Sequence, residues 1–348
     1  MIDHLMALGV HCYYTGDWAV GRNACERALR LPLTEGQENQ VRNNRTWYTQ
    51  KLDELLTCRW IPLNIEGITP GYTQFNPSIV ATEEGWLVNV RSSNYRIRDW
   101  RYVIPPEDGD YIRTHNHLVE LTDDLQVKSA TKLDVQYPKT NFFADGLEDI
   151  RLNTIDGKLH FSVTLRNHAP WDGLCRIAVG QIEQNRVVGL QVLDSPRQQH
   201  EKNWMPFTGQ KRWLYGFDVK GEAALIAHEP LKGWYLETTF ETPRFARKFR
   251  GGSQLVEVAT NQWLGVIHEV AMVGGHRVYE HRFVLVNGEG LLLKVSPLFV
   301  FKAKFSIEFC AGLAVKGNRV VISFGEMDET ASLVECGVDA VLAIMENV

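Results

Sequence analysis

Five segments of this chain share one pattern, and this repeat constrains the fold more than any other feature of the sequence. In each copy a polar start of small residues leads into an apolar strand, a turn, a second strand and a polar ending. The copies cover residues 76–94, 148–168, 202–218, 251–269 and 308–328, and successive starts lie 49 to 72 residues apart. This spacing leaves room for four strands per unit, which is the period of propeller blades. The repeat therefore predicts an all-β fold, a five-bladed β-propeller.

The first 56 residues differ from the rest, because their apolar and small residues recur at the period of a helix. A Thr15-Gly16-Asp17 turn separates two such stretches, as in a tetratricopeptide helix–turn–helix, and a further helix is expected from about residue 35 to residue 56. One such unit cannot bury its own apolar face. We therefore expect a small helical extension of residues 1–56 that packs on a propeller of residues 57–348, on a second copy of the chain, or on a helical-repeat partner.

The composition narrows the classes of partner. The formal net charge is −5, which argues against a nucleic-acid partner, because general binders of the phosphate backbone carry a strong basic excess. The sequence shows neither a leader-like apolar region at its start nor an apolar run long enough to cross a membrane. The six cysteines are scattered without a Cys-x-x-Cys pair, as expected of reduced thiols. We expect a cytoplasmic protein without a membrane partner.

Polar residues at the starts and endings of the copies are the candidates for a functional site. In a propeller the loops at one end of the blades form a shared concave mouth, so these residues converge there. Sugar chemistry needs such a mixture, because an acid must protonate the leaving oxygen while amides and carboxylates bind hydroxyls. We expect about half of them to satisfy backbone groups instead. The candidates are Asn76, Arg91, Asn94, Glu148, Asp149, Arg151, Arg166, Asn167, His168, Lys202, Asn203, Asp218, Ser253, His268, Glu269, Glu308, Glu326 and Asp328.

Other chemistries lack their patterns in this sequence. His115 with His117, and His276 with His281, are spaced pairs without third and fourth ligands at metal-site spacing, so we expect strand histidines and no metal. Ser253 follows two glycines but lacks the Gly-x-Ser-x-Gly elbow of a serine hydrolase. No glycine-rich phosphate loop precedes a helix, so neither a nucleotide-binding fold nor a cofactor is expected.

The order of the motifs resembles that of glycoside hydrolase family 130, whose members are five-bladed propellers that act on β-mannosides, many by phosphorolysis. The resemblance covers about residues 70–345. Residues 146–151, Gly-Leu-Glu-Asp-Ile-Arg, are similar to the family's Gly-x-Glu-Asp-Pro-Arg, and residues 201–203, Glu-Lys-Asn, to its Ser-Lys-Asn. Residues 263–270 are similar to its Trp-Leu…Tyr-His-Gly-Val. Residues 309–313 and 323–328 are similar to its Phe-Pro-Cys-Gly-Leu and Tyr-Tyr-Gly-Ala-Ala-Asp.

The resemblance implies roles for the matched residues. Asp149 corresponds to the family's general acid and His268 to a residue that helps to hold phosphate. The anion, which is inorganic phosphate or another group, would be bound by Arg151, Lys202, Arg250 and His268. The resemblance does not supply a base; from the candidates at the blade ends, we expect Glu269 or Glu326 to act as the base if water is the nucleophile. Substrate hydroxyls would be bound by Asn76, Arg91, Asn94, Glu148, Arg166, Asn203, Asp218, Glu308 and Asp328.

The predicted function is that of a carbohydrate-active enzyme that cleaves or transfers a glycosyl group, such as β-mannosyl, from an oligosaccharide or glycan by inverting single displacement at the mouth. Phosphorolysis needs several fixed cations, and Asp218 stands where an arginine for phosphate is expected, so hydrolysis, phosphorolysis and transfer all stay open. The alternatives are a glycosyltransferase that uses a sugar phosphate or nucleotide sugar, and a non-catalytic propeller that binds a glycan or a protein.

Overall fold

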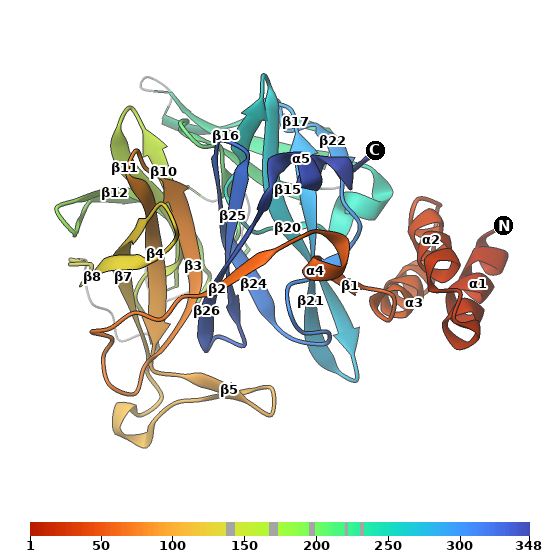
Figure 1. The fold of residues 1–348 in the computed structure, drawn as a ribbon, viewed down its shortest axis with the longest axis horizontal. Helices are drawn as coiled ribbons and strands as arrows, with labels where there is room; N and C mark the ends of the chain where they lie inside the picture. The colour runs from red at the N-terminus through yellow and green to blue at the C-terminus, as the bar shows by residue number, and fades with distance from the viewer. Residues whose placement is uncertain (137–142, 167–172, 195–198, 220–221, 230–232) are drawn as a thin grey trace.

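The computed structural model describes residues 1–348 apart from 137–142, 167–172, 195–198, 220–221 and 230–232. Within this described part, five sheets of four or more strands follow one another along the chain, and helices α1–α3 lie together on one side of them (Figure 1). Each predicted copy supplies the first strands of a different sheet. The predicted five-bladed propeller is therefore confirmed.

Blades 1 and 2 are antiparallel meanders, as expected where short alternating strands are joined by turns. A hairpin and a 3-10 turn are inserted between β4 and β7 of blade 1, and this insertion accounts for the long spacing between the first two copies. Blade 1 contains β3 (Thr73–Ala81), β4 (Gly85–Ser93), β7 (Ile112–Thr122) and β8 (Val127–Lys132), with β9 (Ala144–Asp145) beside β7. The insertion contains β5 (Arg96–Arg98), β6 (Arg101–Val103) and η1 (Pro106–Asp108). Blade 2 contains β10 (Glu148–Ile155), β11 (Lys158–Leu165), β12 (Arg176–Glu183) and β13 (Arg186–Val192).

Blades 3, 4 and 5 follow the same plan with shorter first strands in blades 3 and 4. Blade 3 contains β14 (Met205–Pro206), β15 (Arg212–Val219), β16 (Glu222–Glu229) and β17 (Gly233–Glu241), followed by η2 (Arg244–Lys248). Blade 4 contains β18 (Arg250–Gly251), β19 (Val256–Ala259), β20 (Gln262–Val273), β21 (His276–Val286) and β22 (Leu292–Val295), extended by β23 (Phe299–Val300) and β27 (Glu346–Asn347). Blade 5 contains β24 (Glu308–Lys316), β25 (Arg319–Glu326) and β26 (Thr330–Gly337).

The ring is closed by a strand from the start of the propeller region. β2 (Arg59–Pro62) pairs antiparallel with β26 and forms the outer strand of blade 5. Blade 5 thus joins residues from both ends of the propeller, which covers an edge that would otherwise be open.

A buried amide at the centre ties the blades together. Gln254, between β18 and β19, donates to the carbonyl oxygens of Ile79 in blade 1, at 2.5 Å, and Leu152 in blade 2, at 3.4 Å. Its Oε1 accepts from the backbone N–H of Leu313 in blade 5, at 3.1 Å. Gly312 of blade 5 allows the backbones of blades 5 and 1 to approach closely, because a Cβ there would lie 2.6 Å from the backbone nitrogen of Ile79.

Three α-helices form the N-terminal segment, and two short α-helices lie elsewhere in the described chain. Gly16, with φ of 81°, ends the first helix, and a capping box of Thr34 and Gln37 starts the third. The helices are α1 (Ile2–Thr15), α2 (Trp18–Leu29), α3 (Glu35–Thr46), α4 (Leu52–Leu55) and α5 (Val338–Ala343).

The expected continuous helix from residue 35 to residue 56 is wrong. α3 ends at Thr46, and β1 (Gln50–Lys51) instead pairs in parallel with β23 of blade 4. The side chains between them are used for tertiary contacts: Tyr48 donates to the carbonyl oxygen of Gly9, and Thr49 donates to Glu280. Aromatic and β-branched residues are also weak helix formers, so tertiary packing decides the conformation here.

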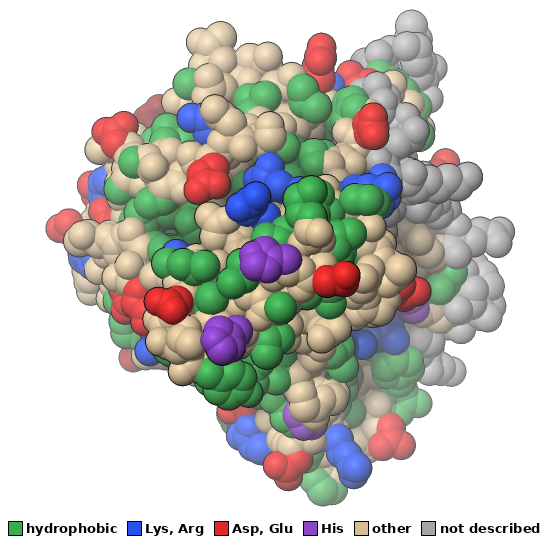
Figure 2. All heavy atoms as spheres, turned by 90° about the vertical axis from the view of Figure 1, so that its right-hand side faces the viewer, with side chains coloured by type: hydrophobic (Ala, Val, Ile, Leu, Met, Phe, Trp, Pro, Cys, Tyr) green, Lys and Arg blue, Asp and Glu red, His purple; other side chains and the backbone are tan. Residues whose placement is uncertain are grey.

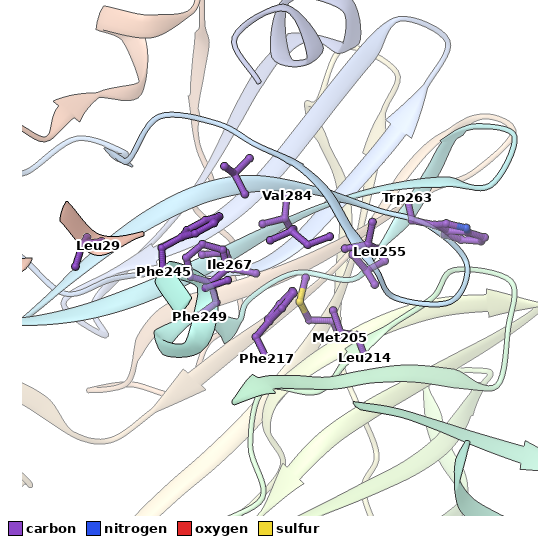
Figure 3. Close-up of a cluster of buried hydrophobic side chains, with 14 of the residues drawn as sticks. Leu29, Met205, Leu214, Phe217, Phe245, Phe249, Leu255, Trp263, Ile267 and Val284 are labelled. Carbon is purple, nitrogen blue, oxygen red and sulfur yellow. The ribbon is translucent and has the colours of Figure 1, made fainter. Parts of the chain in front are cut away.

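The helical segment and blades 3 and 4 share one hydrophobic core. Leu29 of α2 belongs to the same cluster of buried side chains as Phe245, Phe249 and Ile267 of β20 (Figure 3). On the outer side of the segment Tyr14 is 81% exposed. Figure 2, which faces this side of the molecule, shows hydrophobic side chains spread among basic and acidic ones. The segment therefore buries one apolar face and leaves other apolar side chains in solvent.

Candidate functional site

Three blades have a residue in the left-handed backbone region within or just before their first strand. Asn76, Asp149 and Asn203 have φ values of 45°, 54° and 63°, and each is the first or second residue of its copy. The pairing of β10 with β11 shifts between Glu148 and Arg151, which is a β-bulge. A bulge interrupts the strict alternation of side chains. Glu148 and Asp149 can therefore both reach the mouth, as a site that uses both carboxylates requires.

Asp149 is held by residues of blade 1. Its Oδ1 accepts hydrogen bonds from Asn76 Nδ2 at 3.0 Å and Arg91 Nη1 at 2.8 Å. The Arg91 guanidinium is itself fixed over the Phe75 ring, 4.8 Å from its centroid. Burial alone would raise the pKa of Asp149, but Arg91 and the Asn76 hydrogen bond outweigh it and hold this pKa below its usual value. The carboxylate is therefore ionised near neutral pH.

The charges continue from Arg91 to the next blades. Glu148 lies 3.9 Å from Arg91 Nη2 and 3.4 Å from Lys202 Nζ. Burial would lower the pKa of Lys202, but Glu148 more than compensates, so this pKa is raised and the ammonium stays charged. Negative and positive groups thus alternate from blade 1 to the start of blade 3.

Arg151 lies buried behind these residues, 1% exposed. Its Nε donates to the carbonyl oxygen of Gly252 at 2.6 Å, and its Nη1 to that of Asp149 at 3.1 Å. Its Nη2 donates to Asn203 Oδ1 at 3.2 Å. Among the residues that the structure describes, Arg151 forms no ion pair within 4.0 Å, and its hydrogen bonds go to carbonyl and amide oxygens. The Asp149 carboxylate still stabilises its charge from a greater distance. An additional anion nearby would be stabilised by this cation.

Asp328 is a second acidic group of the mouth, and its environment differs from that of Asp149. Its Oδ2 accepts from the Tyr95 hydroxyl at 2.8 Å. Burial raises the pKa of Asp328, and although Arg91 opposes this effect, the pKa remains above its usual value. The pKa values of Asp149 and Asp328 are thus shifted in opposite directions, a pattern that separates acid and base roles in many active sites.

An open cavity of about 550 Å³ lies beside the charged cluster and contains two of the predicted anion-binding residues, Lys202 and Arg250. Asn203, which accepts from Arg151, also lines it. Its volume is in the range of small-molecule sites. The cavity can therefore hold an anionic or strongly polar ligand next to Lys202, which also contacts Glu148 of the charged cluster.

His268 lies buried beside this cavity, opposite Arg250 in the pairing of β18 with β20. Its ring stacks on that of Tyr279, with centroids 5.0 Å apart. Burial, together with His281 and Arg250, holds the pKa of His268 well below its usual value, so the ring is neutral. It can donate or accept a hydrogen bond, but it adds no positive charge at neutral pH.

Tyr95, Tyr102 and Tyr279 belong to the mouth although the repeat did not single them out. Partial desolvation and the charge of Asp328 raise the pKa of Tyr102, which lies on the inserted hairpin. At the tip of this hairpin Trp100 stacks on His276 of blade 4, with centroids 4.5 Å apart, so the hairpin reaches across from blade 1. The unusually long spacing after the first copy is the sequence signal that could have revealed it.

Two predicted substrate-binding residues hold the backbone instead. The Asn94 side chain donates to the carbonyl oxygen of Tyr111 and accepts from the N–H of Arg113. The carboxylate of Glu308, which is fully buried, accepts from the N–H groups of residues 301–303 at 2.6 to 2.8 Å. Burial raises the pKa of Glu308 to about 7 despite these hydrogen bonds. Both side chains are therefore already satisfied within the protein.

Neither predicted base lies in the charged cluster. Glu269 follows His268 and points to the other face of β20, where it binds Arg42 and Arg45 of α3 and Arg282 of β21. Alternation along a strand is the physical reason. Glu326 accepts from Lys302 Nζ at 2.6 Å and from Ser332 at 3.3 Å.

The remaining predicted residues give less information. Arg166 lies over the Phe143 ring, 4.8 Å from its centroid. Asp218 is in β15, and its side chain is outside the described residues, as are Asn167 and His168. In the part of the chain that the structure covers, no group of His, Cys, Asp and Glu could hold a metal ion, and no helix is long and apolar enough to cross a membrane.

Comparison with known proteins places the fold. No protein-family model and no curated protein sequence matches the chain. Among solved structures, the chain is similar to the β-1,2-mannobiose phosphorylase from Listeria innocua in complex with β-1,2-mannobiose, with 13% identity and a TM-score of 0.55 over 85% of this chain and 98% of that one. It is also similar to a mannose phosphorylase from Leishmania mexicana in complex with a phosphate ion, with 11% identity and a TM-score of 0.50 over 83% of this chain and 91% of that one.

A third similar structure is described as part of the glycoside hydrolase family 130 of mannoside phosphorylases, which contains hydrolases that target β-1,2 mannosidic linkages in Candida mannan. It shares 11% identity and a TM-score of 0.53 over 77% of this chain and 85% of that one. The class is thus a β-propeller with a concave, charged mouth. The chain has the five-bladed propeller fold of glycoside hydrolase family 130.

Proposed function

We propose that the protein is a carbohydrate-active enzyme that cleaves or transfers a glycosyl group by inverting single displacement at the propeller mouth. The observation that carries this proposal is the position of Asp149, which is held at a bulge by Asn76 and Arg91. The charge of Lys202 acts on Asp149, and Lys202 lines a cavity together with Arg250. A positioned carboxyl group beside an anion-binding cavity supplies the two elements that displacement at a sugar carbon needs.

Asp149 would act as the acid toward the leaving oxygen, directly or through a sugar hydroxyl. In the free protein Arg91 keeps it ionised, so it must gain a proton in the complex. A bound sugar excludes water from the mouth, and desolvation raises the pKa of a carboxyl group. Asp328, whose pKa is already raised, is the neighbouring group that can hold a proton.

Phosphate is the nucleophile that this mouth favours over water. Hydrolysis needs a protein base, and both Glu269 and Glu326 are bound to cations outside the cluster. Phosphate needs no such base but requires fixed positive charge, which Lys202 and Arg250 supply in the cavity. Transfer from a sugar phosphate is the same reaction in reverse and uses the same groups.

The substrate class is proposed from the similar structures, one of which is a complex with β-1,2-mannobiose and another a complex with a phosphate ion. We propose a β-mannoside oligosaccharide as the glycosyl donor. The test is to incubate the full chain with β-1,2-mannobiose and inorganic phosphate and to follow the products by ³¹P and ¹H NMR. An inverting phosphorylase forms α-mannose 1-phosphate and mannose.

Two other outcomes would decide against this reaction. Mannose formation that does not depend on phosphate would indicate a hydrolase. Binding of mannosides without turnover, in either direction and with α-mannose 1-phosphate as an alternative donor, would support a non-catalytic glycan-binding propeller.

A further inference from the structure

A second cavity, of about 230 Å³, lies between blades 2 and 3 and is separate from the mouth. β10 begins at the mouth with Glu148 and ends with Ile155, which lines this cavity. The cavity therefore lies toward the opposite end of the strands. None of the residues assigned above to the mouth lines it.

The wall from blade 3 is aromatic. Trp213 of β15 is paired with Ile226 of β16, and His228, two residues further along, is paired with Trp234 of β17. These side chains lie on the same face of the sheet, because alternate residues of a strand share a face. The ring centroids of Trp213 and Trp234 are 4.9 Å apart, and those of His228 and Trp234 are 4.4 Å apart.

The facing wall from blade 2 carries uncharged polar side chains among apolar ones. His160 of β11 lies opposite Gln181 of β12, and Gln191 of β13 lies opposite Val179. Burial and the charges of nearby lysines lower the pKa of His160, so its ring is uncharged at neutral pH. Lys211 is at the cavity, and none of the described lining residues is acidic.

Both tryptophans leave a hydrogen-bond donor unused. The indole N–H groups of Trp213 and Trp234 are buried, and neither has a partner among the described residues. Buried tryptophans usually find an acceptor for this group, and an unsatisfied buried donor indicates a missing partner. A ligand oxygen in the cavity would supply an acceptor beside this wall after a small movement of the side chains.

We propose that this cavity binds one ring of a neutral sugar. The aromatic wall can cover the C–H face of a sugar ring, while the amides of Gln181 and Gln191 pair with its hydroxyls. The absence of acidic groups among the described lining residues and the neutral His160 suit an uncharged ligand. The volume is below the range of drug-sized ligands, which suits a single ring. This inference does not depend on whether the mouth is catalytic.

The test observes the two tryptophans directly. The full chain is labelled with 5-fluorotryptophan, and the ¹⁹F resonances of Trp213 and Trp234 are assigned with the variants Trp213→Phe and Trp234→Phe. D-mannose, D-glucose, D-galactose and N-acetyl-D-glucosamine are each titrated to about 50 mM, because single sugar rings bind in the millimolar range. We expect a saturable shift of both resonances with at least one of these sugars.

A matched pair of variants tests the position of the ligand. Gln181→Leu keeps the volume of the side chain but removes its amide, and we expect it to weaken binding at least about fivefold. Gln262→Leu changes an exposed glutamine of blade 4 and should leave the affinity unchanged. If no sugar shifts either resonance up to the highest concentration, the cavity holds only water and the proposal is overturned. An equal affinity in the Gln181→Leu variant would also overturn it, whatever the activity measured at the mouth.

Discussion

The Arg91 guanidinium of blade 1 donates to the Asp149 carboxylate of blade 2 at 2.8 Å, across the boundary between the two blades. This contact fixes the carboxylate at the bulge and also keeps it ionised. Any acid role of Asp149 therefore depends on how a ligand changes this pair. The first prediction follows from that dependence.

Replacing Asp149 with Asn should lower turnover at least about a hundredfold on an unactivated mannoside, because the amide keeps the shape but cannot transfer a proton. Binding of the mannoside should survive, since an amide and an acid present similar hydrogen-bonding shapes. Steady-state kinetics and calorimetric titration of the variant with β-1,2-mannobiose measure the two effects separately. Unchanged turnover would exclude Asp149 as the acid.

The Asp328→Asn variant is the matched comparison for Asp149. If Asp328 only binds hydroxyls, the acidic limb of the pH–rate profile should stay in place while KM rises. A displaced limb would assign the titrating proton to Asp328.

The second prediction concerns the contact between the helical segment and blade 4. Arg42, Arg45 and Arg282 surround the buried Glu269 carboxylate. Burial would raise the pKa of Glu269, but these arginines hold it far below its usual value. At pH 7 Glu269→Gln should reduce the free energy of unfolding by about 3–5 kcal/mol, because it removes the buried carboxylate that the three arginines share.

The sign of the pH dependence checks the cause. A lowered pKa in the folded state stabilises the protein above the ordinary carboxyl pKa of about 4.3, and this stabilisation is lost as the pH falls toward the folded-state value. Urea unfolding should therefore show a difference between wild type and Glu269→Gln that is constant near neutral pH and shrinks below about pH 4. Asp134→Asn, in the exposed pair with Arg186, should change stability by at most about 1 kcal/mol. Equal effects of both variants would contradict this account.

The third prediction concerns the central amide. Gln254→Leu leaves the carbonyl oxygen of Ile79 and the N–H of Leu313 without their partner. An unsatisfied buried group costs about 1–3 kcal/mol, so the variant should lose roughly 2–6 kcal/mol of stability. Gln262→Leu, on the surface, should stay within about 0.5 kcal/mol of wild type in the same chemical denaturation experiment. A Gln254→Leu protein as stable as wild type would show that water replaces the amide.

The fourth prediction concerns the helical segment as a whole. Deleting residues 1–55 removes Leu29 and Val41 from the core shared with blades 3 and 4 and uncovers Phe245. The exposed apolar surface should promote aggregation and lower the melting temperature. Light scattering and thermal unfolding measure both effects. A truncated protein that remains monomeric and equally heat-stable would show that the segment contributes nothing to the propeller.

The repeat in the sequence was sufficient to predict the number of blades and the region where the polar residues meet. The carboxylate pair of Glu148 and Asp149 even required a bulge, because adjacent residues of a regular strand point in opposite directions, and the structure contains it. By the same rule His268 and Glu269 cannot share a face. The alternation of strand residues was the available signal against Glu269 as a base.

Local sequence determined these features because strand alternation and turn positions depend on neighbouring residues. Only the tertiary structure decided three other features. They are the closure of the ring by β2, the position of Gln254 between blades and the arginine partners of Glu269. Each of these depends on residues far apart in the chain, such as Arg42 and Glu269, whose pairing requires packing of the whole segment on the propeller. Whether a polar residue serves the backbone or the mouth is decided in the same way, because it depends on which groups the folded chain brings within hydrogen-bond distance.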